Sequence, residues 1–157
     1  MPITYKCFNA DDGGQNGVLY NAVRAYVLQD CANNTRCIIA QTYGWPMNSW
    51  CLGSVKDMSY VFSSMGTFNE DINGWNTSSV TDMSKMFNGA TSFNQDLSNF
   101  NTTSVTKMNS MFKGAESFNR SVSNWNTSSV SNMETMSMVL LPSTKIYQTL
   151  IPQALLR

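Results

Sequence analysis

The chain has 157 residues, enough for one domain or one short array of repeats, and its ten basic and ten acidic residues give no net charge. Charged residues make up 13% of the chain, about half of their usual share of roughly 25%. Such a chain has no cationic surface for nucleic acid, and the absence of histidine removes the commonest general base and metal ligand. We therefore expect no nucleic-acid partner.

Residues 1–16 contain no recognisable secretory signal, because "MPITYKCFNADDGG" lacks a basic start and an apolar core. We predict that this segment is loosely ordered. No run in the chain reaches the roughly 18 apolar residues that a transmembrane helix needs. We therefore expect no membrane span.

Four cysteines precede the repeats described below, and their spacing fits no zinc signature. They are Cys7, Cys31, Cys37 and Cys51. Cys31 and Cys37 are close enough in sequence to form a small disulfide in an oxidising compartment. The alternative is that they are buried free thiols, because the missing secretory signal and the even number of cysteines favour opposite compartments.

Residues 17–49 are predicted to form a helical cap followed by a connector. Within residues 17–30, apolar side chains recur at i, i+3, i+4, i+7 and i+8, which is one face of an amphipathic helix. These residues are Leu19, Ala22, Val23, Tyr26 and Val27. A helix placed before an array of repeats can cover the first open face of its core.

Residues 50–136 repeat with a period of 25 residues, and the unit is "WNTSSVTDMSKMFNGATSFNQDLSN". The units align on Trp50, Trp75, Phe100 and Trp125. One unit offers about eight apolar side chains, worth on the order of 12–24 kcal/mol. Ordering its backbone costs about 1–2 kcal/mol per residue, which is more than this burial supplies. A single unit is therefore unstable, and the period predicts that the units stack.

Each unit combines two local patterns. "SSVTDMS" alternates apolar and polar residues like a short strand, and "MSKMFNGA" has the spacing of a short helical turn. We therefore predict an α/β repeat solenoid, a flattened coil with short parallel strands and short helical turns. One column of asparagines, Asn69, Asn94 and Asn119, is predicted to have a structural role in turns or as a ladder.

The repeated unit closely resembles that of the BspA-like surface proteins, a leucine-rich-repeat relative catalogued in mycoplasmas and expanded in some algae. The resemblance covers about residues 18–136, and "YGWPMNSWCLGSVKDMSYVF" looks like that family's entry into its array. It implies a leucine-rich-repeat-like solenoid displayed at the cell surface or outside the cell. It also implies a protein that binds other molecules and has no catalytic residues.

Two polar columns vary between otherwise similar units, and we predict that they form a partner-binding face. The columns are Asp57, Asp82, Lys107 and Asn132, and Tyr60, Lys85, Ser110 and Thr135. A fixed apolar core beside variable polar columns is what a repeat protein needs to recognise a partner. Neutral drift on a solvated face gives the same pattern.

These observations favour a non-catalytic binding module for a protein or glycan at a cell surface. The first alternative is a structural or ice- or mineral-surface protein that presents rows of Thr, Ser and Asn, with Thr77 and Thr102 one repeat apart. The second is a truncated product without a function.

No catalytic, cofactor-binding or metal-ligating residue is predicted. Asp71, Asp96 and Ser121 share one column, and a column of carboxylates can bind calcium. The residues around them supply few further oxygen ligands, so we favour surface or turn capping for this column.

Residues 137–157 depart from the repeat. Codons can be chosen for Met136 and the tail so that one inserted base restores "MFNGATSFNQDLSNFNTSSVTK", which is the missing unit in register. We therefore expect that the tail is frameshifted and disordered, and that the chain is a fragment of a longer protein. The uncovered C-terminal end of the stack is predicted to self-associate, with the oligomeric state left open.

Overall fold

The computed structural model describes residues 4–34 and 36–136. Its helices all precede the repeats: α1 spans Val18–Leu28, α2 spans Ile38–Tyr43, and the short 3-10 helix η1 spans Met47–Ser49. None of these helices is long and apolar enough to cross a bilayer. The predictions for residues 137–157 concern a segment outside the described residues.

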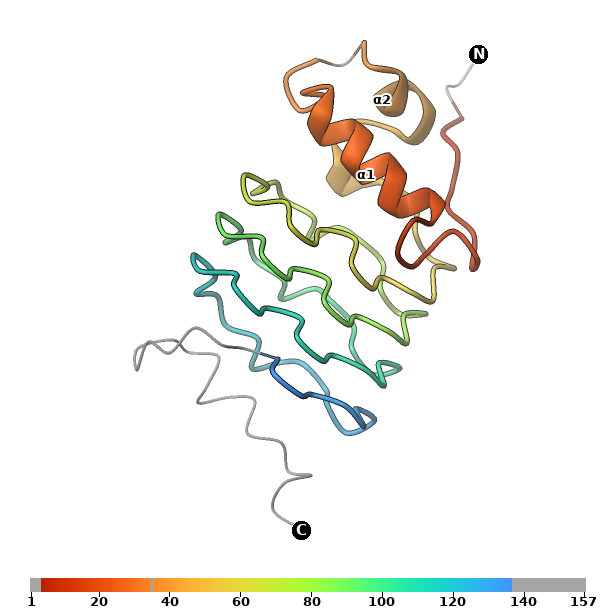
Figure 1. Cartoon of the computed structure of the whole chain (residues 1–157). Coiled ribbons are helices and arrows are strands. Elements are labelled where there is room, and N and C mark those ends of the chain that lie inside the picture. Colours follow the sequence, from red (N-terminus) through yellow and green to blue (C-terminus); the bar gives the residue numbers. More distant parts are fainter. Residues whose placement is uncertain (1–3, 35, 137–157) are drawn as a thin grey trace.

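Helix α1 packs its apolar stripe against the first turn of the repeats. Leu19, Ala22, Val23 and Tyr26 are buried, which are four of the five residues on the predicted apolar face. The Tyr26 ring meets the Trp50 ring edge-on, with 5.5 Å between the ring centroids. Figure 1 shows α1 lying at the N-terminal end of the stack.

The repeats form four stacked coils, which run side by side from yellow to blue in Figure 1. We call them coil 1 (residues 50–74), coil 2 (75–99), coil 3 (100–124) and coil 4 (125–136). Residues 25 apart meet in parallel bridges, and the same backbone hydrogen bonds recur between successive coils. These bonds join Met58 N to Asp82 O (2.8 Å), Met83 N to Lys107 O (2.9 Å), and Met108 N to Asn132 O (2.8 Å).

Columns of identical aromatic side chains fill the core of the stack. The rings of Phe62, Phe87 and Phe112 are stacked, with centroids 5.2 and 5.4 Å apart. A second column repeats this arrangement with Phe68, Phe93 and Phe118, whose centroids are 5.8 Å apart at each step. All six rings are at most 2% exposed, so each coil buries its apolar side chains mainly against its neighbours.

The prediction of an α/β solenoid with short parallel strands and short helical turns is wrong. Residues 4–34 and 36–136 contain no strand, only three isolated parallel bridges, and the coils contain no α-helix. The reason is local backbone geometry. Each coil has a left-handed residue three positions after its bridge residue, for example Lys85 at φ 56°. A residue in this region can continue neither a right-handed helix nor an extended strand.

Tight turns replace the regular elements that the alternating pattern predicts. In coil 2, Val80 N donates to Thr77 O (3.0 Å), Met86 N to Met83 O (3.2 Å), and Phe93 N to Ala90 O (3.1 Å). The apolar residues still point inward because the coil reverses direction at every turn. Periodicity alone does not distinguish this chain of turns from a strand followed by a helical turn.

The segment before α1 lies along coil 1. Phe8 N donates to Cys51 O and Gly14 N donates to Asp57 O, each at 2.9 Å. A Cβ atom on Gly13 would lie 1.9 Å from the Asp57 carbonyl oxygen, so only glycine allows this close approach. Residues 8–14 therefore occupy the edge that a preceding coil would cover.

Candidate functional site

The first predicted column lies on one face of the stack, one residue per coil. Successive members pair in parallel bridges, from Asp57 to Asp82, from Asp82 to Lys107, and from Lys107 to Asn132. The bridges hold the four backbones in register. Differences between the coils on this face are therefore differences between side chains.

The second predicted column lies three residues further along each coil. Its members all have a positive φ, between 53° and 62°: Tyr60, Lys85, Ser110 and Thr135. This conformation is uncommon for residues other than glycine and costs about 1–2 kcal/mol per residue. Lys85 Nζ donates to the Tyr60 hydroxyl at 2.7 Å and lies 4.9 Å from the centre of its ring. The structure thus brings two of these variable side chains into direct contact.

Three members of the first column also stabilise their own turn. Asp57 Oδ1 accepts a hydrogen bond from Ser59 N (2.7 Å), and Asp82 Oδ1 accepts one from Ser84 N (2.9 Å). Asn132 Oδ1 does the same for the backbone nitrogen of residue 134 at 3.1 Å. Each bond closes a turn in which a side-chain oxygen binds the backbone two residues on. These residues therefore have a structural role that the sequence pattern does not reveal.

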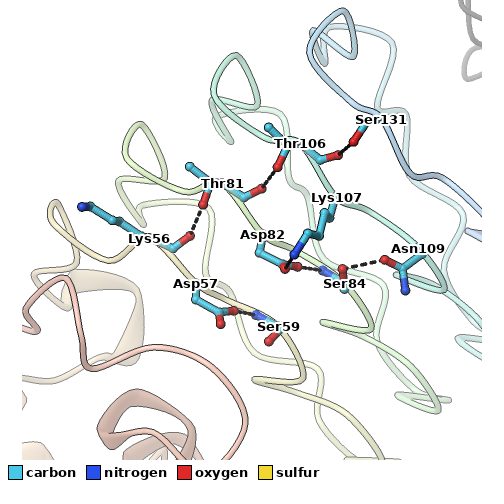
Figure 2. Close-up of polar contacts among 10 residues, drawn as sticks. All are labelled: Lys56, Asp57, Ser59, Thr81, Asp82, Ser84, Thr106, Lys107, Asn109 and Ser131. Carbon is cyan, nitrogen blue, oxygen red and sulfur yellow. Dashed lines mark hydrogen bonds and ion pairs between the residues drawn. The ribbon is translucent and has the colours of Figure 1, made fainter.

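Lys107 is the exception in the first column. Its Nζ lies 3.2 Å from Asp82 Oδ2, and its side chain is 57% exposed, whereas that of Asp82 is 20% exposed. Figure 2 shows Lys107 reaching back toward Asp82 from the next coil. Ser84 Oγ donates to Asn109 Oδ1 at 2.7 Å between the same two coils. Coils 2 and 3 thus share an ion pair and a side-chain hydrogen bond on this face.

A neighbouring row of hydroxyls was missed by the sequence analysis. Thr81 Oγ1 donates to Lys56 O (3.2 Å), and Thr106 Oγ1 donates to Thr81 O (3.1 Å). Ser131 Oγ continues the row by donating to Thr106 O at 3.2 Å, as Figure 2 shows. These three hydroxyl residues are exposed. The available signal was their position directly before the first column, one repeat apart.

The threonines that the sequence analysis placed in a presented row lie inside the stack. Thr77 is 1% exposed and Thr102 is 2% exposed. Thr77 Oγ1 donates to Asn101 O (3.1 Å), and Thr102 Oγ1 donates to Asn126 O (3.0 Å). Their hydroxyls link successive coils and are not offered to solvent.

The asparagine column connects the coils on another side of the stack. Asn69 Oδ1 accepts a hydrogen bond from Asn94 N (2.8 Å), and Asn94 Oδ1 accepts one from Asn119 N (3.0 Å). The predicted ladder is therefore formed by side chain to backbone bonds. These bonds support the stack, and they engage the side-chain oxygens of Asn69 and Asn94 in contacts between coils.

The column considered for calcium makes turn-capping hydrogen bonds. Asp71 Oδ1 accepts from Asn73 N at 2.8 Å, and Asp96 Oδ1 accepts from Ser98 N at 3.0 Å. The Ser98 hydroxyl bonds the other carboxylate oxygen, and this hydrogen bond is the main cause of the lowered pKa of Asp96. Among residues 4–34 and 36–136, no three His, Cys, Asp or Glu side chains are placed to hold a metal ion together.

The structure pairs the four cysteines in two disulfides. Cys31 bonds Cys37, the pair considered in the sequence analysis, and Cys7 bonds Cys51, a pair that spacing alone did not indicate. The first bridge is buried and the second is exposed. The second bridge ties the N-terminal segment to coil 1.

Glu70 is the acidic group most affected by burial. Its burial, and then the charge of Asp30, raise the pKa of its carboxyl group. Tyr26 on α1 is also affected, since burial and then the charge of Glu70 raise the pKa of its hydroxyl. Tyr26 belongs to α1 and Glu70 to coil 1, and neither belongs to the two variable columns.

Comparison with known proteins gives one match. The family described as "Mycoplasma protein of unknown function, DUF285" matches residues 32–143. The comparisons with curated proteins and with solved structures return no match. The matched range includes α2, η1 and all four coils but not α1.

Proposed function

We propose, from the premise that the chain belongs to the mycoplasma protein family of unknown function DUF285, that it is a non-catalytic recognition module. Its partner is a protein or glycan, and the contact face consists of the two variable columns. The observation that carries this proposal is a constant backbone with changing side chains. The bridges repeat at every coil, while the bridge residue changes from aspartate to lysine to asparagine.

The contacts on this face support a recognition role over simple solvation. Lys85 bonds the hydroxyl of Tyr60, and Lys107 pairs with Asp82. These contacts hold long side chains in defined positions, which lowers the entropy that binding would otherwise cost. The face also carries both signs of charge, with Asp57 and Asp82 in the first column beside Lys85 and Lys107, which favours a partner of complementary charge.

The setting proposed for this module is the cell surface. Two disulfides join all four cysteines. Disulfides persist in oxidising environments and are rare in the cytosol. They therefore support the location that the BspA-like resemblance implies.

The test compares binding by the wild-type chain with binding by a face variant. The oxidised protein is screened on a glycan array and on an array of extracellular proteins. The face variant combines Tyr60→Ala, Lys85→Ala and Lys107→Ala. A matched control changes exposed residues outside both columns, Thr67→Ala, Ser92→Ala and Glu116→Ala.

We expect the face variant to bind a partner at least about tenfold more weakly, which corresponds to about 1.4 kcal/mol. The control variant should change the affinity by less than about twofold, because exposed residues outside a contact face contribute little. Equal binding by all three proteins to every partner found would refute the proposal.

The alternative of an ice- or mineral-surface protein is supported by one observation. Thr81, Thr106 and Ser131 form an exposed, regularly spaced hydroxyl row. Thermal hysteresis measures this activity directly. A clear gap between the freezing and melting points, lost in Thr106→Lys, would favour this alternative over the recognition module.

A further inference from the structure

One coil leaves open a hydrogen-bond position that the other three fill themselves. In coils 1, 2 and 4, a side-chain oxygen of the first column accepts a bond from the backbone N–H two residues later, at 2.7, 2.9 and 3.1 Å. Two of these acceptors are carboxylates and one is an amide. The fold therefore has a standard place for an oxygen acceptor at this turn.

Coil 3 has Lys107 at this position, and an ammonium group cannot accept a hydrogen bond. Among the described residues, no acceptor is found for Asn109 N, the equivalent backbone donor. The place that Asp57 and Asp82 fill with a carboxylate oxygen is thus left to an outside acceptor. Lys107, the cation at this position of coil 3, has 57% of its side chain exposed, and its Nζ lies 3.2 Å from Asp82 Oδ2.

We propose that Lys107 and the Asn109 N–H form a carboxylate-binding notch that recognises an acidic side chain in a peptide segment of the partner. This inference rests on the proposed recognition function and deepens it by naming the chemistry of the contact. The incoming carboxylate takes the position of the missing turn acceptor. It accepts one bond from Asn109 N and one from Lys107 Nζ.

Asp82 shares Lys107 with the incoming group and does not fill the notch. Its Oδ1 is engaged by Ser84 N, and its Oδ2 takes one contact of the Lys107 ammonium, which has three donors. Asn109 is held from the other side, because its Oδ1 accepts from Ser84 Oγ. The close-up shows the four side chains together on this face (Figure 2).

The coils favour a peptide carboxylate over an acidic sugar. Sugar recognition commonly uses an exposed aromatic ring with its apolar face free. Every tryptophan and phenylalanine of the four coils is buried. Tyr60 is the remaining aromatic residue of the described coils; it is half-buried, and its hydroxyl accepts a hydrogen bond from Lys85 Nζ. A charge-assisted bond to a carboxylate is the stronger contact that this surface offers.

The experiment is an NMR titration of the oxidised, ¹⁵N-labelled full chain at constant ionic strength. The probe is an end-blocked tetraglutamate peptide, and tetraglutamine is the neutral control. We expect the Asn109 amide signal to shift and saturate with tetraglutamate, with a Kd on the order of 1 mM for so small a contact. Tetraglutamine should leave it unchanged.

Variants at one position separate charge from the open donor. Lys107→Asn supplies the amide oxygen that Asn132 supplies in coil 4, so it should fill the notch and abolish the shift. Lys107→Arg keeps a cation that cannot cap the turn and should retain binding within about threefold. Unchanged signals from α1 and coil 1 show that each variant is folded.

Three results would overturn the notch: no shift at Asn109, an equal shift with tetraglutamine, or full binding by Lys107→Asn. Tighter binding of an oligogalacturonate than of tetraglutamate would overturn the peptide assignment in favour of an acidic glycan. Loss of array binding in Tyr60→Ala, with Lys107→Asn unaffected, would remove the notch and leave the recognition function standing. A shift of the Asn109 signal with tetraglutamate, together with no effect of the face variant on any partner, would refute the recognition function and leave the notch standing.

Discussion

Replacing Phe100 by tryptophan should stabilise the stack, because the same column holds tryptophan in the coils on either side. Trp75 Nε1 donates to Met47 O at 2.9 Å, and Trp125 Nε1 donates to Leu97 O at 3.2 Å. Both acceptors lie 28 residues before the indole. The same offset from residue 100 leads to the carbonyl of residue 72, to which a phenylalanine cannot donate.

A second contact is also missing at residue 100. Phe62 stacks on Trp75 with 5.4 Å between the ring centroids, and Phe112 stacks on Trp125 at 6.1 Å. Within the described residues, no such pair is found between Phe87 and Phe100. Coil 2 therefore lacks the ring contact that coils 1 and 3 make.

The expected gain follows from these two contacts. A hydrogen bond contributes about 0.5–1.5 kcal/mol, and an aromatic pair contributes about 0.5–1.5 kcal/mol beyond its area. Overpacking a core costs about 1–3 kcal/mol, but this column already accommodates tryptophan in two other coils. We expect Phe100→Trp to raise the free energy of unfolding by about 1 kcal/mol and the Tm by about 2–4 °C.

The assay is thermal and urea unfolding followed by circular dichroism, with Trp75→Phe as the matched reverse change. That variant removes the bond to Met47 O and should lower stability by about 1 kcal/mol or more. If Phe100→Trp destabilises the protein while Trp75→Phe has no effect, the column does not obey the repeat geometry and the reasoning fails.

Three further changes test the backbone, a disulfide and a buried charge. Ser64 has a left-handed φ of 60°, and glycine occupies the same position one coil later, at Gly89. Because glycine adopts this conformation without strain, Ser64→Gly should stabilise the protein by about 0.5–1 kcal/mol in urea unfolding. A loss of stability would contradict the left-handed assignment. Replacing both cysteines of the Cys7–Cys51 bridge by serine should cost about 4 kcal/mol, because this bridge closes a loop of 44 residues. Removing the Cys31–Cys37 bridge, which closes a loop of 6 residues, should cost about 2 kcal/mol. Equal losses of Tm in the two variants would contradict this order. Burial raises the pKa of Glu70 above its ordinary 4.5, so the folded state binds more protons and stability falls as pH rises from 4.5 through the folded value. Glu70→Gln should flatten this part of the plot of stability against pH, and an unchanged plot would refute the raised pKa of Glu70.

The sequence by itself determined which residues meet. The 25-residue period aligns the phenylalanines that stack in two columns, and the i, i+3, i+4 spacing selects the buried side of α1. Both features follow from apolar side chains having to leave water, and this requirement is visible as periodicity. The two variable columns on the surface could be identified for the same reason, since residues 25 apart share one environment.

Only the tertiary structure decided what the backbone does between those residues. An alternating pattern fits a strand and also fits a series of turns, and the left-handed residues and side-chain caps selected the turns. The Cys7–Cys51 pair and the open donor at Asn109 likewise depend on contacts between distant segments. Such contacts are set by packing in three dimensions, which local spacing does not encode. A single lysine in a capping column therefore becomes a candidate binding site only when the neighbouring coils are placed beside it.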